Sequence, residues 1–311
     1  MGELQPATSV PVEDAREMLA SRIIPTMTLS SSSNPLTAPC ISSTSSLSHT
    51  ATATERFKVE GGAILTGGAG SLGLVAARAL IEHGLSVVCL FDLPGTLKSS
   101  EAQVDTLRKD FPHQVYTYAV DVTCPQAVEE AVQQAVATAQ SIDILCCFAG
   151  IVDCVHSIAA SSQQFRKVID VNLVGSFHCA RAVAKHMIEQ KRGGSIVLTS
   201  SISAHPTNFP QPQLAYNVSK AAVSHMTRNL AAEWAVHGIR VNSISPGYMD
   251  TVLNAGDSLK PIRDIWASHC PFGRMGDIEE ITGPIILLSS RRAGGYITGA
   301  DLLVDGGAMC F

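Results

Sequence analysis

The sequence is poor in aromatic residues and in charge, and it has no excess of basic side chains. Aromatic residues fill 5% of the 311 positions and charged residues 16%, and 22 basic against 27 acidic side chains give a net charge of −5. Because a phosphate backbone is bound mainly through clustered basic residues, we expect no nucleic-acid partner. What the chain has instead is 46% hydrophobic residues and 24 glycines. That composition supports a large core and is typical of a closely packed α/β fold.

Patterns that would indicate a membrane span, a disulfide framework or a metal site are also missing. No apolar run approaches the roughly 18 residues that span a bilayer, so no membrane partner is expected. The nine cysteines form no C-x-x-C pair, which favours free thiols that act as small hydrophobic side chains in a reducing compartment. The ten histidines show neither H-x-x-x-H nor H-E-x-x-H spacing, so we expect no metal. No secretory or organelle signal is visible, and a cytoplasmic location is therefore expected.

The composition changes sharply near residue 56. From Thr28 to Thr54, 15 of 27 positions are Ser or Thr. Such a segment buries too little apolar surface to offset the entropy of ordering it. Residues 1–56 are therefore predicted to be a mostly disordered extension, with a short amphipathic helix over 12–24 that docks on a neighbouring subunit as the alternative.

Short β-rich runs alternate with longer helical runs from Gly61 onward. The predicted strands are 63–65, 86–91, 115–120, 144–148, 195–199, 240–244 and 302–304. The predicted helices are 72–83, 101–110, 125–140, 165–187, 215–237 and 278–288. Helices between successive strands imply right-handed crossovers and a parallel sheet covered on both faces. Residues 57–311 are therefore predicted to form a single doubly wound α/β domain with seven parallel strands.

A glycine-rich turn, Thr66 to Gly73, joins the first strand to the first helix of this domain. Glycines suit a sharp turn whose backbone N–H groups approach a pyrophosphate at a helix N-terminus, although a plain tight turn is an alternative. Asp92 follows 19 positions after Gly73, at the end of the second strand. A carboxylate there accepts hydrogen bonds from an adenosine ribose and repels a 2′-phosphate, unless it is merely a solvated turn residue. Together these features predict a Rossmann-type site that prefers NAD, with NADP as the alternative. Asp121 ends the third strand and is expected at the adenine edge.

A second group of residues predicts proton transfer. Tyr216 and Lys220 are four positions apart on a predicted helix and so share one face. A phenol beside an ammonium has a lowered pKa and can exchange a proton with an alcohol or ketone near neutral pH. Ser201 follows a strand and can bond the same substrate oxygen. Asn172 lies on the preceding helix.

With these motifs, residues 57–311 resemble the short-chain dehydrogenase/reductase family. The resemblance implies that Tyr216 is the general acid/base and that Lys220 binds ribose hydroxyls and lowers the tyrosine pKa. It also implies that Ser201 orients the substrate and that Asn172 holds a water in the proton relay. The residues that it implies in cofactor binding are Gly67, Ser71, Leu72, Gly73, Asp92, Asp121, Val122, Ala149, Gly150, Tyr216, Lys220, Pro246, Gly247 and Thr251. The resemblance further implies a homotetramer, with a homodimer as the alternative.

Within that family the chain is most similar to the fungal polyol and ketose branch. The similarity rests on Pro210-Gln211-Pro212-Gln213 before the tyrosine, and on Pro246-Gly247-Tyr248-Met249-Asp250-Thr251. It implies a small-molecule substrate, namely a sugar alcohol and its ketose, in an NAD(P)-dependent reaction of the D-arabinitol 2-dehydrogenase type. One alternative is a ketoreductase of secondary metabolism that acts on a more apolar carbonyl compound. Another is a nucleotide-binding scaffold without turnover.

The sequence departs from the family pattern at two places. Ser71 stands where a second glycine is usual, and its Cβ would lie close to the pyrophosphate. Cys147-Phe148 replaces two asparagines before Ala149-Gly150, and the loss of those amide contacts is expected to loosen either the sheet or the adenosine side. Neither change removes a proton-transfer group, so activity is still expected. Trp266, in the segment 252–271, is expected in a lid over the substrate.

Overall fold

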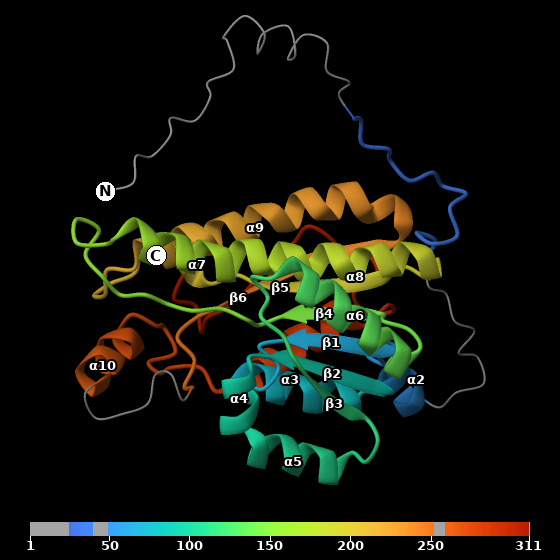
Figure 1. The fold of residues 1–311 in the computed structure, drawn as a ribbon, viewed down its shortest axis with the longest axis horizontal. Helices are drawn as coiled ribbons and strands as arrows, with labels where there is room; N and C mark the ends of the chain where they lie inside the picture. Colours follow the sequence, from blue (N-terminus) through green and yellow to red (C-terminus); the bar gives the residue numbers. More distant parts are fainter. Residues whose placement is uncertain (1–24, 40–48, 252–258, 311) are drawn as a thin grey trace, which may run out of the picture.

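Seven parallel strands form one sheet in the order β3-β2-β1-β4-β5-β6-β7 (Figure 1). The computed structural model describes residues 25–39, 49–251 and 259–310. The strands are β1 (Gly62–Thr66), β2 (Val87–Asp92), β3 (Val115–Ala119), β4 (Ile144–Cys147), β5 (Gly194–Thr199), β6 (Ile239–Pro246) and β7 (Asp301–Val304). The predicted doubly wound sheet is confirmed, and each predicted strand overlaps one of these. Because the strand order reverses between β1 and β4, a crevice opens at their carboxyl ends, where ligands of such sheets bind.

Helices cover both faces of the sheet, as the alternation of strands and helices predicts. One face carries α6 (Pro125–Ala139), α8 (Ser176–Gln190) and α9 (Leu214–Trp234), and its core includes Ile64, Val132, Val183 and Leu230. The other face carries α3 (Ser71–Glu82), α5 (Glu101–Asp110) and α11 (Thr282–Ser289), with Leu65, Leu80, Leu107 and Ile285 in its core. Successive residues of β1 thus point into different cores, which requires an apolar side chain at every position.

Several helical details differ from the sequence-based expectation. The single helix predicted over 165–187 is divided into α7 (Ser162–Ile169), a π-helical stretch Asp170–Gly175, and α8. Three further helices were not predicted, namely α2 (His49–Arg56), α4 (Pro94–Ser99) and α10 (Lys260–Ser268). Pro94 and Gly95 resemble a turn in sequence, but proline is well tolerated in the first turn of a helix, which is where Pro94 lies.

Part of the N-terminal region contacts the domain. The Asn34 side-chain Nδ2 donates to the Val236 carbonyl at 2.8 Å, and Leu36 lies so close to Gly238 that a Cβ added there would be 2.8 Å from its own. Residues His49–Arg56 form α2, and the Ser290 hydroxyl donates to the Arg56 carbonyl at 3.0 Å. The alternative helix over 12–24 falls outside the described residues. No helix within the described ranges is long and apolar enough to cross a membrane.

Candidate active site

The glycine turn between β1 and α3 is packed so tightly that its glycines have no room for side chains. Gly67 has a φ of +64°, and a Cβ there would lie 2.6 Å from the Ala149 backbone nitrogen. A Cβ on Gly73 would lie 2.5 Å from the Gly67 carbonyl oxygen. The turn therefore sits directly against the segment that follows β4, with the start of α3 folded back over it.

The start of α3 fits a pyrophosphate. Gly70 precedes the helix in extended conformation, and no side chain among the described residues caps the first turn. The N–H groups of Ser71 and Leu72 thus point outward at the positive end of the helix dipole. The Ser71 hydroxyl is an additional donor at the same end, so the serine keeps the chemistry that an anion requires.

Asp92 joins the end of β2 to this turn. Its Oδ2 accepts from the Ala69 N–H at 3.1 Å and its Oδ1 from the Leu93 N–H at 2.8 Å. Each carboxylate oxygen keeps a lone pair for a ribose hydroxyl. Asp121 differs, because its Oδ1 accepts both the N–H and the hydroxyl of Thr123, at 2.9 and 2.7 Å. Its contact with adenine stays a prediction.

The proton-transfer residues come from β5 and α9. Ser201 lies two positions after the end of β5, and Tyr216 and Lys220 occupy successive turns of α9. Burial raises the pKa of Tyr216 above its usual value, and a hydrogen bond with Ser201 lowers it by a smaller amount. These two side chains therefore meet, as the sequence predicts.

Lys220 does not act on the tyrosine in the predicted way. Its Nζ lies 5.5 Å from the centre of the Tyr216 ring and donates to the Thr199 carbonyl at 2.7 Å. Burial lowers the pKa of Lys220 to about 8, so the lysine still carries most of its charge at neutral pH. In the protein alone the lysine does not lower the tyrosine pKa as predicted, because burial of the phenol raises it.

Asn172 is buried in the π-helical stretch and its side chain is committed to other residues. Its Nδ2 donates to the Ile151 carbonyl at 2.9 Å and to the Ser219 hydroxyl at 3.0 Å, and its Oδ1 accepts from the Ile151 N–H at 2.8 Å. Ser219 in turn donates to the Tyr216 carbonyl at 2.7 Å. The asparagine amide therefore links the segment after β4 to the first turn of α9, and a water on its side chain is not needed to explain its burial.

The segment after β4 brings two more predicted residues to the same place. A Cβ on Gly150 would lie 3.3 Å from Asn172 Oδ1 and 3.6 Å from Lys220 Nζ. Cys147 is buried, and Phe148 packs on the core beside α3. The Phe148 N–H donates to the Thr66 carbonyl at 2.8 Å. Backbone pairing and an aromatic contact therefore hold this segment in place of the missing asparagines.

The segment that follows β6 contains the residues predicted to bind the nicotinamide. The Gly247 N–H donates to the Val304 carbonyl at 3.0 Å, and a Cβ on Gly247 would lie 2.9 Å from the Asp305 Cα. Thr251 ends the described part of this segment. Pro246 and Gly247 thus lie at the carboxyl end of the sheet, on the same edge as Ser201.

A chain of hydrogen-bonded side chains extends from Ser201 to α10, and the sequence motifs did not predict it. The Ser201 hydroxyl donates to Ser203 Oγ at 3.0 Å, and Gln213 Nε2 lies 3.3 Å from the same oxygen. The remaining members are Asn208, Gln211, Tyr248 and Trp266. The sequence does contain a hint of these contacts, because glutamines alternate with prolines just before Tyr216. That pattern was used only to assign a family branch.

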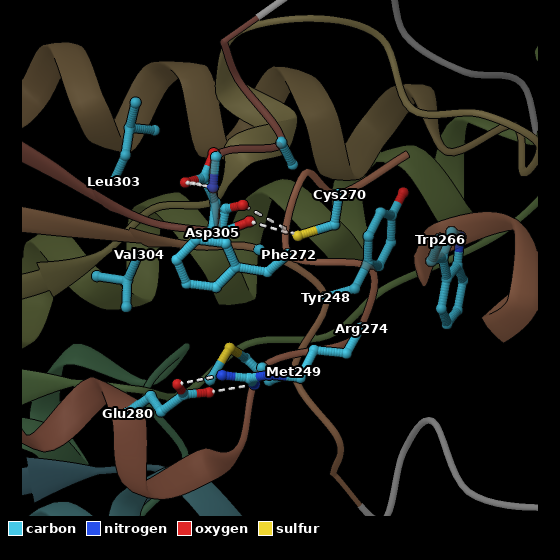
Figure 2. A pocket seen from close by; sticks show the side chains of 15 residues that line it. Tyr248, Met249, Trp266, Cys270, Phe272, Arg274, Glu280, Leu303, Val304 and Asp305 are labelled. Atoms are coloured by element: carbon cyan, nitrogen blue, oxygen red, sulfur yellow. Dashed lines mark hydrogen bonds and ion pairs between the residues drawn. The ribbon is translucent and has the colours of Figure 1, made fainter. Parts of the chain in front are cut away.

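The outer end of this chain borders a cavity of about 360 Å³ between α10 and the segments after β6 and β7. Figure 2 shows Tyr248 and Trp266 next to each other on one side of it, and Arg274 paired with Glu280 on another. The predicted lid residue Trp266 is buried. His205, which follows the Ser201 segment, does not belong to this chain of hydrogen bonds, because its Nε2 bonds Asp301 Oδ2 at 3.1 Å.

Comparisons with known proteins agree with this geometry. The family model described as enoyl-(acyl carrier protein) reductase matches residues 67–309. The NADP-dependent mannitol dehydrogenase of Hypocrea jecorina is 37% identical over 246 residues, which cover 78% of this chain and 90% of that protein. The ribulose-forming D-arabinitol 2-dehydrogenase of Scheffersomyces stipitis is 34% identical over 274 residues, 82% of this chain and 96% of that one. The crystal structure of a gluconate 5-dehydrogenase from Burkholderia cenocepacia with NADP and tartrate has a TM-score of 0.75 at 30% identity, over 83% and 99% of the two chains.

Proposed function

The chain belongs to the short-chain dehydrogenase/reductase family and is an oxidoreductase, and from this premise we propose that it interconverts a sugar alcohol and its ketose by hydride transfer. The observation that carries the proposal is the meeting of Ser201 and Tyr216 at the carboxyl end of the sheet, beside a turn that fits a dinucleotide. Relatives named mannitol and D-arabinitol dehydrogenases support the substrate class.

The residues divide the chemistry between them. A bound nicotinamide nucleotide supplies or accepts the hydride. Tyr216 gives its phenolic proton to the ketone oxygen during reduction and takes a proton from the alcohol during oxidation. Its raised pKa keeps the phenol protonated at neutral pH, which is the form that reduction requires. Ser201 bonds the same substrate oxygen, Lys220 binds the ribose hydroxyls, and Asn172 fixes the position of α9.

For the nucleotide we propose a preference for NAD over NADP. The support is Asp92, whose carboxylate is held at the ribose end by the Ala69 and Leu93 N–H groups. A 2′-phosphate there would meet a fixed negative charge. The relative from Hypocrea jecorina is named NADP-dependent, so we expect the two proteins to differ in their preferred nucleotide.

The test is a turnover assay of purified protein with D-arabinitol, D-mannitol and galactitol, each with NAD⁺ and NADP⁺, and with the matching ketoses and reduced nucleotides. We expect turnover of at least one polyol–ketose pair, with a higher kcat/KM for NAD(H). Asp92→Ser should move the preference toward NADP(H). Turnover of apolar ketones alone would favour the alternative ketoreductase, and no turnover with nucleotide bound would favour a silent scaffold.

We also propose that the protein self-associates as a homotetramer in the cytoplasm. The helices α8 and α9 lie side by side as an outer layer (Figure 1), and Phe177 and Val218 on them are 36% and 44% exposed. Apolar side chains on that layer favour a symmetric partner. Cysteines such as Cys89 and Cys146 pack in the core as free thiols, which suits a reducing compartment. Light scattering at micromolar concentration should report four chains, and a fully active monomer would contradict the assembly.

A further inference from the structure

Tyr248 has a hydroxyl group whose environment fixes it as a donor. Asn208 Nδ2 and Gln211 Nε2 donate to its oxygen at 2.9 and 3.1 Å. A phenolic oxygen that accepts two hydrogen bonds has its own proton left to give. No acceptor for that proton lies within the ranges that the structure describes.

The orientation of the Gln211 amide follows from its other partner. The Trp266 indole Nε1–H lies 3.0 Å from Gln211 Oε1, and because an indole can only donate, the oxygen of Gln211 must face it. The NH₂ group of Gln211 then faces Tyr248. The Asn208 amide lies with its oxygen toward Gln213 Nε2 at 2.8 Å and its NH₂ group toward Tyr248.

The ring of Tyr248 is also fixed in position. It stacks on the Trp266 indole (Figure 2), and the ring centroids are 4.3 Å apart with planes inclined by 5°. Trp266 therefore both supports the ring and orients Gln211. A donor fixed by packing and by hydrogen bonds loses little entropy when it binds a substrate.

A chain of hydrogen bonds links this hydroxyl to the predicted proton-transfer residues. Gln213, which donates to Asn208, also approaches Ser203 Oγ at 3.3 Å, and Ser203 is bonded to Ser201. Tyr248 also acts electrostatically on Tyr216, raising its pKa further. Burial raises the pKa of Tyr248 itself, so its proton stays in place at neutral pH.

We propose that Tyr248 donates this hydrogen bond to a substrate hydroxyl next to the reacting carbon, and thereby selects α-hydroxyketones and vicinal diols over simple ketones and alcohols. The inference rests on the proposed function, in which Ser201 and Tyr216 bind the reacting oxygen. A neighbouring hydroxyl oxygen is then the acceptor that Tyr248 lacks. A substrate without this oxygen leaves a half-buried, preoriented donor unpaired, and a site built to hydrogen-bond a substrate hydroxyl discriminates against such a substrate.

The test compares two ketones that differ by one hydroxyl group, 1-hydroxy-2-butanone and 2-butanone, with NADH or NADPH in the wild type and in Tyr248→Phe. The wild type should show a kcat/KM about 10- to 100-fold higher for the hydroxyketone. Tyr248→Phe should bring the ratio close to 1, mainly by loss of activity on the hydroxyketone. Trp266→Phe keeps an aromatic ring but deletes the indole N–H, and it should reduce the ratio by a smaller factor.

Tyr116→Phe is the matched control, because it removes a phenolic hydroxyl from an exposed residue of the edge strand β3, and it should leave the ratio unchanged. A ratio in Tyr248→Phe equal to that of the wild type would overturn the inference, and so would an equal loss of activity on both ketones. If the wild type reduces both ketones equally well, the proposed oxidoreductase activity is supported and the proposed role of Tyr248 is refuted. If the wild type reduces neither these ketones nor any ketose, the proposed function itself fails. If Tyr248→Phe does not fold, the ratio in Trp266→Phe decides in its place, and an unchanged ratio there overturns the inference.

Discussion

Replacing Lys220 by methionine should abolish turnover and yet stabilise the protein. The side chain is 4% exposed, and its Nζ has the Thr199 carbonyl as a hydrogen-bond partner. Burial lowers its pKa from 10.5 to about 8. At neutral pH the folded protein therefore holds a buried ammonium ion that the unfolded chain would leave in water.

The size of the effect follows from that pKa. The difference between 10.5 and about 8 corresponds to about 3 kcal/mol of lost free energy of unfolding at pH 7. Methionine has a similar length and no charge, so it recovers this amount. It also leaves the Thr199 carbonyl without its donor, at a cost of about 1 kcal/mol. The net gain for Lys220→Met is about 2 kcal/mol at pH 7.

The gain should disappear as the pH rises. Between pH 8 and pH 10.5 the unfolded chain binds more protons at Lys220 than the folded protein does, so wild-type stability increases across this window. The methionine variant has no such group. Its advantage of about 2 kcal/mol at pH 7 should therefore vanish near pH 10.

Denaturant unfolding of both proteins at pH 7, 9 and 10, without nucleotide, measures this difference directly. Lys109→Met is the control, because Lys109 is exposed on α5 and its replacement should change stability by less than about 0.5 kcal/mol at every pH. A Lys220→Met variant that is less stable than the wild type at pH 7, or whose stability difference is independent of pH, would refute the reasoning.

Three further predictions concern Tyr216 and the N-terminal contact. Tyr216→Phe should lose at least 90% of turnover with NADH affinity changed only a few-fold, because it deletes the proton donor alone; a tenth of wild-type activity or more would contradict its role. Alcohol oxidation should accelerate with pH up to and beyond 10.0, since burial raises the pKa of Tyr216 above that value, and a plateau in kcat at neutral pH would oppose this. Asn34→Ala removes the bond to the Val236 carbonyl and should lower the melting temperature by about 2–4 °C, with nucleotide binding unchanged.

Sequence reasoning located the sheet because its central strands β1, β2 and β4 are short, mainly apolar runs that are buried on both faces, and because helical runs separate all seven strands. It missed α4 and α10 for a local reason. α4 begins at Pro94 and α10 has Pro261 in its first turn, and proline reads as a breaker unless the helix start is recognised. The π-helical stretch around Asn172 also has no periodic pattern of its own. Asn172 within it bonds Ile151 and Ser219, which are distant in sequence, and such contacts leave no local pattern.

The part of the candidate site that sequence reasoning could predict is the part whose chemistry requires particular residue types. Tyr216, Lys220 and Ser201 carry groups that few other residues can replace, so spacing and type were enough to propose them, and their roles stay predictions. The predicted lowering of the tyrosine pKa failed for the protein alone, because burial is a property of the folded chain and here it raises that pKa. The amides of Asn208, Gln211 and Gln213 could not be assigned roles, since an amide offers a donor and an acceptor and only its partners decide which one faces the substrate.

The groups proposed for catalysis and the groups proposed for specificity are therefore held in place by different interactions. The proton-transfer residues sit on α9 and after β5, where the sheet core holds the backbone, and their positions depend on apolar packing. The proposed selectivity depends instead on one indole N–H, because Trp266 orients Gln211 and Gln211 orients the proton of Tyr248. A change at Trp266 therefore alters which substrates bind without moving Ser201 or Tyr216. Selectivity in this protein can thus change through α10 alone, while the chemistry at α9 is preserved.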